Sequence, residues 1–291
     1  MSTVVTPAAA SSWPPEKAAR DGRHGQPAIR VAPSRAFWRL TVATVIATYL
    51  LIVAGAVVRV TGSGLGCPDW PTCHGRLIPP LEPAALIEYT HRLLGAIVSV
   101  LILAVPVAAW LWRRQRRILV PATLVPLLLA IQIPLGAAVV WLELPPMVVL
   151  VHLGFAMLIL GGLTWVAAQA GPEVRVEAAP VAGGRHYRAL VTATAVVVFV
   201  LVLTGAYTRA SGASWACAGF PGCDVPGTAI QAAEAAGARG LVHIHLFHRS
   251  TAYLASVLVI ASLAETWRLR RGVPALKRAA SLLAVLLLAQ I

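Results

Sequence analysis

Long apolar segments separated by short polar ones dominate the chain from about residue 38 onward. Seven such segments occur, at about 40–58, 84–112, 118–142, 147–170, 189–208, 241–265 and 279–291. The first six each reach the roughly 20 residues that a helix needs to cross a bilayer. The seventh stops after thirteen residues at Ile291, so we expect a span that is cut short in this sequence.

The composition agrees with a polytopic membrane protein. Hydrophobic residues make up 58% of the chain and charged residues only 12%, which lies outside the range of soluble proteins. The net charge of +13 could indicate a nucleic-acid partner. However, the arginines flank the apolar segments, and no soluble segment has a basic patch interleaved with aromatic residues, so we expect no nucleic acid.

The polar segments predict the orientation. Residues 1–37 are rich in Ala, Pro, Ser and Arg and lack apolar periodicity, so we expect a disordered tail. Basic residues gather in this tail and in alternate loops, around 113–117, 175–188 and 268–278, whereas the intervening loops hold few. Because basic loops stay in the cytoplasm, the N-terminus is expected there. We expect the membrane to be a bacterial plasma membrane rather than a mitochondrial inner membrane.

The two halves of the chain share a repeated pattern. A set of first-half positions returns 150 residues later: Gly55-Ala56, Arg59, Gly62, Cys67, Pro71 and Cys73 recur as Gly205-Ala206, Arg209, Gly212, Cys217, Pro221 and Cys223. Two dipeptides return 157 and 158 residues later: His91-Arg92 and Gln132-Ile133 recur as His248-Arg249 and Gln290-Ile291. Such self-similarity indicates a duplicated unit.

The repeat predicts an all-α membrane protein of duplicated four-helix bundles in a parallel pseudo-twofold arrangement. We expect a first half at 38–170, a cytoplasmic linker at 171–188 and a second half at 189–291. Eight spans are expected from this repeat, with the eighth and part of the seventh missing here.

All four cysteines lie in the loops expected outside the cell, in two pairs of equal spacing: Cys67 with Cys73, and Cys217 with Cys223. An oxidising compartment and paired spacing favour two disulfides within these loops. A zinc site that uses His74 is the weaker alternative, because neither pair has the usual metal-knuckle spacing. A structural and a redox role for the bridges both remain open.

Ionisable residues open the second apolar segment, in the run Glu88-Tyr89-Thr90-His91-Arg92. On a helix Glu88 and His91 share a face, whereas Arg92 is turned about 100° from His91. Ionisable groups are costly inside a bilayer, so their presence indicates a functional site. The alternative is that they lie in the wet interface.

A second histidine, His152, lies inside the fourth apolar segment at the same depth as His91, roughly 10 Å from the expected outer surface. Two histidines at equal depth on different helices of a four-helix unit are what axial ligation of haem iron requires. A single histidine there would more often be a helix contact. His248 holds the repeated position of His91, and His245 replaces Glu88. A counterpart of His152 would fall near position 310, beyond Ile291.

The run from Gly64 to Gly75, read as GLGCPDWPTCHG, and the run from Glu88 to Arg92 closely resemble haem A synthases, membrane enzymes that oxidise a methyl group of haem O to a formyl group. The resemblance extends from about residue 38 to 291. It implies that His91 and His152 flank haem O or haem A, and that Glu88 is the catalytic carboxylate. It also implies a haem b site in the second half with His248 as a ligand, although that site's second axial histidine is absent from this sequence.

Arg92 and Arg249 are expected to pair with haem propionates, or else to serve as interface anchors. The resemblance further implies a haem O synthase and a quinone-linked electron acceptor as partners, and it leaves a homo-oligomer open. Two other functions remain. A diheme electron carrier would need the histidines but not Glu88. A membrane thiol-disulfide oxidoreductase would act through Cys67 and Cys73 and leave the histidines unexplained.

Overall fold

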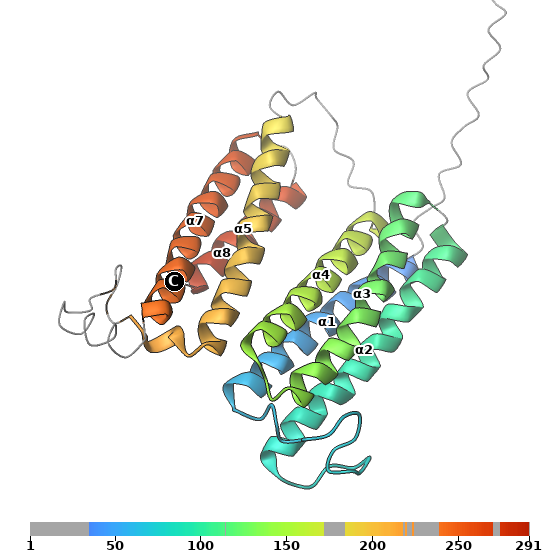
Figure 1. The fold of residues 1–291 in the computed structure, drawn as a ribbon. Coiled ribbons are helices and arrows are strands. Elements are labelled where there is room, and N and C mark those ends of the chain that lie inside the picture. Colours follow the sequence, from blue (N-terminus) through green and yellow to red (C-terminus); the bar gives the residue numbers. More distant parts are fainter. Residues whose placement is uncertain are drawn as a thin grey trace, which may run out of the picture. The chain divides into compact units, whose positions relative to one another are not determined.

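The computed structural model describes residues 35–113, 115–171, 184–217, 219, 223, 239–269 and 274–290, and these form helices and loops without a β-strand. The helices are α1 (Arg35–Val60), α2 (Pro83–Arg113), α3 (Arg116–Trp141), α4 (Pro146–Ala170), α5 (Gly184–Ala210), the short 3-10 helix η1 (Ala213–Trp215), α7 (Arg239–Leu269) and α8 (Pro274–Gln290) (Figure 1). Six of them are long and apolar enough to cross a membrane. The predicted all-α multi-pass architecture is therefore confirmed.

Three helices begin a few residues before the positions expected from hydropathy. The start of α1 at Arg35 takes in the last residues of the predicted tail, because Phe37 is completely buried in the core. The start of α5 at Gly184 takes in the end of the predicted 171–188 linker. Pro274 opens α8, as a proline suits the first turn of a helix. The remainder of the predicted tail and linker, residues 1–34 and 172–183, lies outside the described part of the chain.

Helices α1 to α4 form an antiparallel bundle in which every helix has two neighbours (Figure 1). Both α2 and α4 pack against α1, and both also pack against α3. Consequently α2 and α4 lie diagonally opposite each other, as do α1 and α3. In the second half α7 packs against both α5 and α8.

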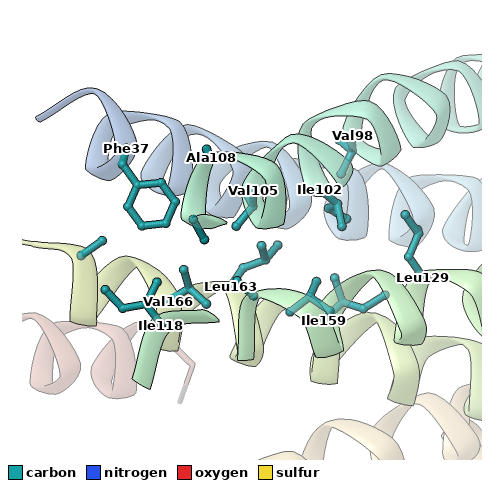
Figure 2. Packing of buried hydrophobic residues seen from close by; sticks show 14 residues of the cluster. Phe37, Val98, Ile102, Val105, Ala108, Ile118, Leu129, Ile159, Leu163 and Val166 are labelled. Atoms are coloured by element: carbon teal, nitrogen blue, oxygen red, sulfur yellow. The ribbon is translucent and has the colours of Figure 1, made fainter. Parts of the chain in front are cut away.

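The hydrophobic core of the bundle lies at the end where α1 and α3 begin. Figure 2 shows side chains from all four helices meeting there, among them Phe37, Ile102, Val105, Ile118, Leu163 and Val166. The core ends at Val98 on α2 and at Ile159 on α4. His91 and His152 each lie seven residues, or about two turns, beyond these positions. The two histidines are thus held by helices whose far ends are firmly packed.

The opposite end of the bundle carries the loop of residues 61–82, called the disulfide loop below. Cys67 and Cys73 form a disulfide in it, and both are completely buried against Ala85 and Tyr89. The loop approaches α2 closely, since a Cβ on Gly66 would overlap the backbone of Ala84. Cys217 and Cys223 form the second disulfide. The alternative zinc site would need thiolates that these bonds consume.

Candidate functional site

His91 reaches from α2 to α1, where its ring packs against Gly55. A Cβ at position 55 would lie 3.0 Å from Cε1 of His91, closer than nearly all contacts of real Cβ atoms. The glycine therefore provides the space that the ring occupies. Nδ1 of His91 is buried and makes no hydrogen bond.

His152 packs against α3 in a corresponding way. A Cβ at Gly136 would lie 3.2 Å from Cε1 of His152, and Nδ1 of this ring is also buried without a partner. Nε2 of His152 lies 3.3 Å from Nε2 of Gln132, which can only donate. The amide oxygen of Gln132 is a third buried polar atom without a hydrogen bond. His91 lies on α2 and His152 on α4, the two helices that lie diagonally opposite each other in the bundle.

This arrangement is unusual for a packed interior and fits a ligand. Buried polar atoms without hydrogen bonds are rare in native proteins, and three occur here on His91, Gln132 and His152. Two imidazoles on diagonally opposite helices are suited to bind one metal centre from opposite sides. An iron bound at Nε2 of His152 would replace the contact with Gln132. The residues present are therefore compatible with a haem between the two rings.

Glu88 and Arg92 form an ion pair that holds the disulfide loop. One carboxylate oxygen of Glu88, which is 2% exposed, accepts the backbone N–H of Cys67 at 2.8 Å. The other oxygen contacts Arg92, which lies four residues later and so on the same helix face. We expected Glu88 to point with His91 at one target. In the structure its hydrogen bonds go to the disulfide loop and to Arg92.

The guanidinium of Arg92 is fully engaged in this loop. Its Nη1 donates to the carbonyls of Asp69 at 2.6 Å and Thr72 at 2.8 Å, and its Nη2 donates to the carbonyl of Cys67 at 2.8 Å and to Glu88. All four terminal N–H groups thus have acceptors. The pairing of Arg92 with a haem propionate stays a prediction, and it would require some of these bonds to be exchanged.

The second half repeats the contact between histidine and glycine. A Cβ at Gly205 would lie 3.0 Å from Cε1 of His248, the same distance as for the first pair. Nδ1 of His248 lies 3.0 Å from the hydroxyl of Thr204, which itself donates to the Leu201 carbonyl. The hydroxyl therefore accepts a hydrogen bond from Nδ1–H, which leaves the lone pair on Nε2 of His248 for a ligand.

His245 and Arg249 take the places of Glu88 and Arg92. Nδ1 of His245 lies 2.9 Å from the Ala213 carbonyl, so this nitrogen donates. Nε2 of the same ring then accepts from Nε of Arg249, at 3.2 Å. Arg249 also donates from Nη1 to the Gly219 carbonyl at 2.7 Å. An uncharged histidine thus supports the second loop where a carboxylate supports the first.

Several of these contacts were not expected from the sequence, among them those of Gly55 with His91, of Gly136 and Gln132 with His152, and of Thr204 with His248. Gln132 carried one signal, because it belongs to the repeat and returns as Gln290. No sequence signal pointed to Gly136 or Thr204. Each contacts a histidine on another helix, and the sequence does not specify how the helices are rotated about their axes.

A Gly55→Ala substitution is expected to displace the ring of His91. Alanine normally stabilises a helix relative to glycine by about 1 kcal/mol, so any loss at this position must come from steric overlap. We expect haem affinity in the first half to fall about ten-fold or more, as when a group that orients a metal ligand is lost. A haem titration followed by absorbance measures this. Gly95→Ala is the matched control, because a Cβ there meets open space. Equal haem affinities of the Gly55→Ala and Gly95→Ala variants would contradict the role of the contact between Gly55 and His91.

Asp69 organises the exposed part of the disulfide loop. Its carboxylate accepts the Thr72 hydroxyl and the backbone N–H groups of His74 and Gly75, which lowers the pKa of Asp69 from 3.8 to about 2. Because the folded loop favours the charged form, its stabilising effect is complete above about pH 4 and is lost as the pH falls through 2.

An Asp69→Asn substitution is therefore expected to accelerate reduction of the Cys67–Cys73 disulfide by an added thiol at neutral pH, about three-fold or more if one backbone hydrogen bond is lost. Mass spectrometry of alkylated peptides measures the rate. The Cys217–Cys223 disulfide is the internal control, and it should be reduced at the wild-type rate. Equal acceleration of both bridges would indicate general destabilisation instead.

The fold and the site together define a multi-pass membrane protein with two histidines on diagonally opposite helices and a disulfide-closed loop at the same end of the bundle. Residues 38–291 match the family model described as cytochrome oxidase assembly protein, COX15-CtaA. The chain belongs to this family.

Proteins named heme A synthase are among its relatives. One from Shouchella clausii is 32% identical over 261 residues, which cover 87% of this chain and 83% of the relative. One from Bacillus pumilus is 34% identical over 200 residues, which cover 65% and 63%. One from Listeria monocytogenes is 28% identical over 236 residues, which cover 78% and 73%. With its six apolar helices, the chain is a multi-pass bacterial membrane protein.

Proposed function

We propose that this protein is a haem A synthase that oxidises a methyl group of haem O to the formyl group of haem A. The observation that carries the proposal is the pair His91 and His152, which lie on diagonally opposite helices and each pack against a glycine of a neighbouring helix. Membership of the family and the names of the relatives support the same activity. The enzyme is then an oxidoreductase whose substrate is itself a haem.

His91 and His152 are proposed to hold the substrate, haem O or haem A, from its two faces. The packing of each ring on a glycine of a neighbouring helix supports this role, because it fixes the orientation of the imidazole. His248 is proposed to be a ligand of haem b in the second half. Thr204 supports that role, since it holds the tautomer in which Nε2 can bind a metal.

Glu88 is proposed to act on the substrate methyl group. A bound haem supplies the redox chemistry that no amino-acid side chain provides. Glu88 can accept a proton from the methyl carbon or stabilise positive charge that develops there, and burial strengthens both effects. Its ion pair with Arg92 holds the carboxylate one turn before His91, and thus close to the proposed substrate.

The two halves are proposed to have different functions. The half at 38–170 would bind the substrate, and the half at 189–291 would bind haem b and transfer electrons, since it has His245 where the first half has Glu88. We place the N-terminus in the cytoplasm, so that both disulfide-closed loops face outward. Haem O synthase and a quinone-linked acceptor remain the proposed partners.

The pigments extracted from the purified protein test this proposal. We expect haem O and haem A to be found together, because substrate and product bind the same site. Haem b alone would favour a diheme electron carrier, and the absence of any haem would favour a thiol-disulfide oxidoreductase. Glu88 argues against the carrier, which has no use for a buried carboxylate beside its ligands.

A further inference from the structure

Two arginines at repeated positions lie at the ends of helices that hold the glycines described above. Arg59 lies in the last turn of α1 and Arg209 in the last turn of α5. Neither guanidinium makes a hydrogen bond or an ion pair with the residues that the structure describes. Arg92 and Arg249, by contrast, are bound to their loops.

Each of these arginines lies about one helical turn after a glycine on which a histidine ring packs. Arg59 follows Gly55 by four residues, and Arg209 follows Gly205 by four, so each shares a helix face with its glycine at a rise of about 6 Å. Side chains on a helix lean toward its N-terminus, so both guanidinium groups lean back toward the glycine and toward the ring packed on it. The two halves thus carry an arginine at the same spacing from the glycine that contacts His91 or His248, half-buried at Arg59 and exposed at Arg209.

None of the carboxylates that the structure describes forms an ion pair with Arg59. Its side chain is half-buried near the end of an apolar helix, where an unpaired charge is costly. The carboxylate of Glu88 is taken by Cys67 and Arg92, and that of Asp69 is taken within the disulfide loop. An anionic ligand would complete the site.

We propose that Arg59 and Arg209 bind the propionates of the haems whose irons are held by His91 and His248, respectively. This inference rests on the proposed function, since it requires a haem at each histidine. Haem carries its two carboxylates on one edge, and guanidinium can bind a carboxylate through two parallel hydrogen bonds. Binding at this place fixes the rotation of the macrocycle about the axis through its iron, with the propionate edge toward the disulfide-closed loop.

The test compares haem with an analogue that lacks the charges. Purified full-length protein is titrated with haem b and with haem b dimethyl ester, whose propionates are neutral. Arg59 is tested in a His248→Ala background and Arg209 in a His91→Ala background, so that only one site responds. We expect Arg59→Ala and Arg209→Ala each to weaken binding of haem b about ten-fold or more, and to leave binding of the ester almost unchanged.

Arg59→Lys keeps the charge and should lose less affinity for haem b than Arg59→Ala, which guards against a general folding defect. Arg76→Ala removes an exposed arginine of the disulfide loop and should change neither affinity. Equal losses for haem and ester, or no loss for either, would overturn the inference while leaving the proposed function intact. A wild-type protein that binds neither compound would overturn the proposed function and the inference with it.

Discussion

Replacing His91 or His152 with alanine is expected to abolish formation of haem A and to remove one low-spin component from the absorption spectrum of the purified protein. Both rings are proposed to bind the same iron, so loss of either leaves the substrate with one axial ligand. The two substitutions should therefore have nearly the same effect, and the double variant should be no worse than either single one.

His243→Ala provides the matched control, because this histidine belongs to α7 and is exposed. It should keep the full spectrum and activity. His248→Ala should remove a different spectral component, that of haem b. If His91→Ala and His152→Ala retained full haem content and an unchanged spectrum, the two residues would not form a ligand pair.

Glu88→Gln is expected to lower the rate of methyl oxidation by about 10²-fold to 10⁴-fold, the usual range for loss of a proton-transferring group. The amide keeps the shape of the side chain and can still accept the backbone N–H of Cys67, so haem should remain bound. Product analysis should show unreacted haem O or an alcohol intermediate in place of the aldehyde.

Because Glu88 also holds the disulfide loop, a variant that weakens the loop alone is needed. Arg92→Lys keeps a positive charge and the carboxylate but cannot reproduce the bonds to three carbonyls. We expect Arg92→Lys to loosen the loop, seen as faster reduction of its disulfide, while retaining much more activity than Glu88→Gln. Haem A produced by Glu88→Gln at the wild-type rate would refute a chemical role for the carboxylate.

The sequence predicted the helices well, because each one is recognised by the local density of apolar residues. The structure has six candidate spans, and each overlaps an expected segment. The two disulfides were also predicted, since the cysteines of each pair are close in sequence and can meet through a turn. The equal depth of His91 and His152 in the membrane, obtained by counting residues along helices of known rise, stays a prediction.

Contacts between helices could not be predicted in the same way. The packing of His91 against Gly55 and of His152 against Gly136 depends on how each helix is rotated about its axis. Likewise, spacing alone allowed Glu88 to face either His91, three residues on, or Arg92, four residues on. The disulfide loop decides between them, because its carbonyls attract Arg92 and its Cys67 N–H attracts the carboxylate.

Comparison of the two halves clarifies which features are structural and which belong to the chemistry. Both halves have a loop closed by a disulfide, an arginine bound to that loop, and a histidine packed on a glycine. Among the described residues the first half has a buried carboxylate, Glu88, where the second has His245. The common features support the proposed haem in each half, and the carboxylate supports the proposal that the oxidation takes place in the first.

The most direct test of this account is the conversion of haem O to haem A in a bacterial host that makes haem O but no haem A. Membranes from cells that express the protein should contain haem A, identified by chromatography and mass spectrometry of extracted pigments. Membranes that contain the Glu88→Gln protein in equal amount should contain haem O and at most traces of haem A. Haem O that remains unconverted in the presence of correctly inserted, haem-loaded wild-type protein would contradict the proposed activity.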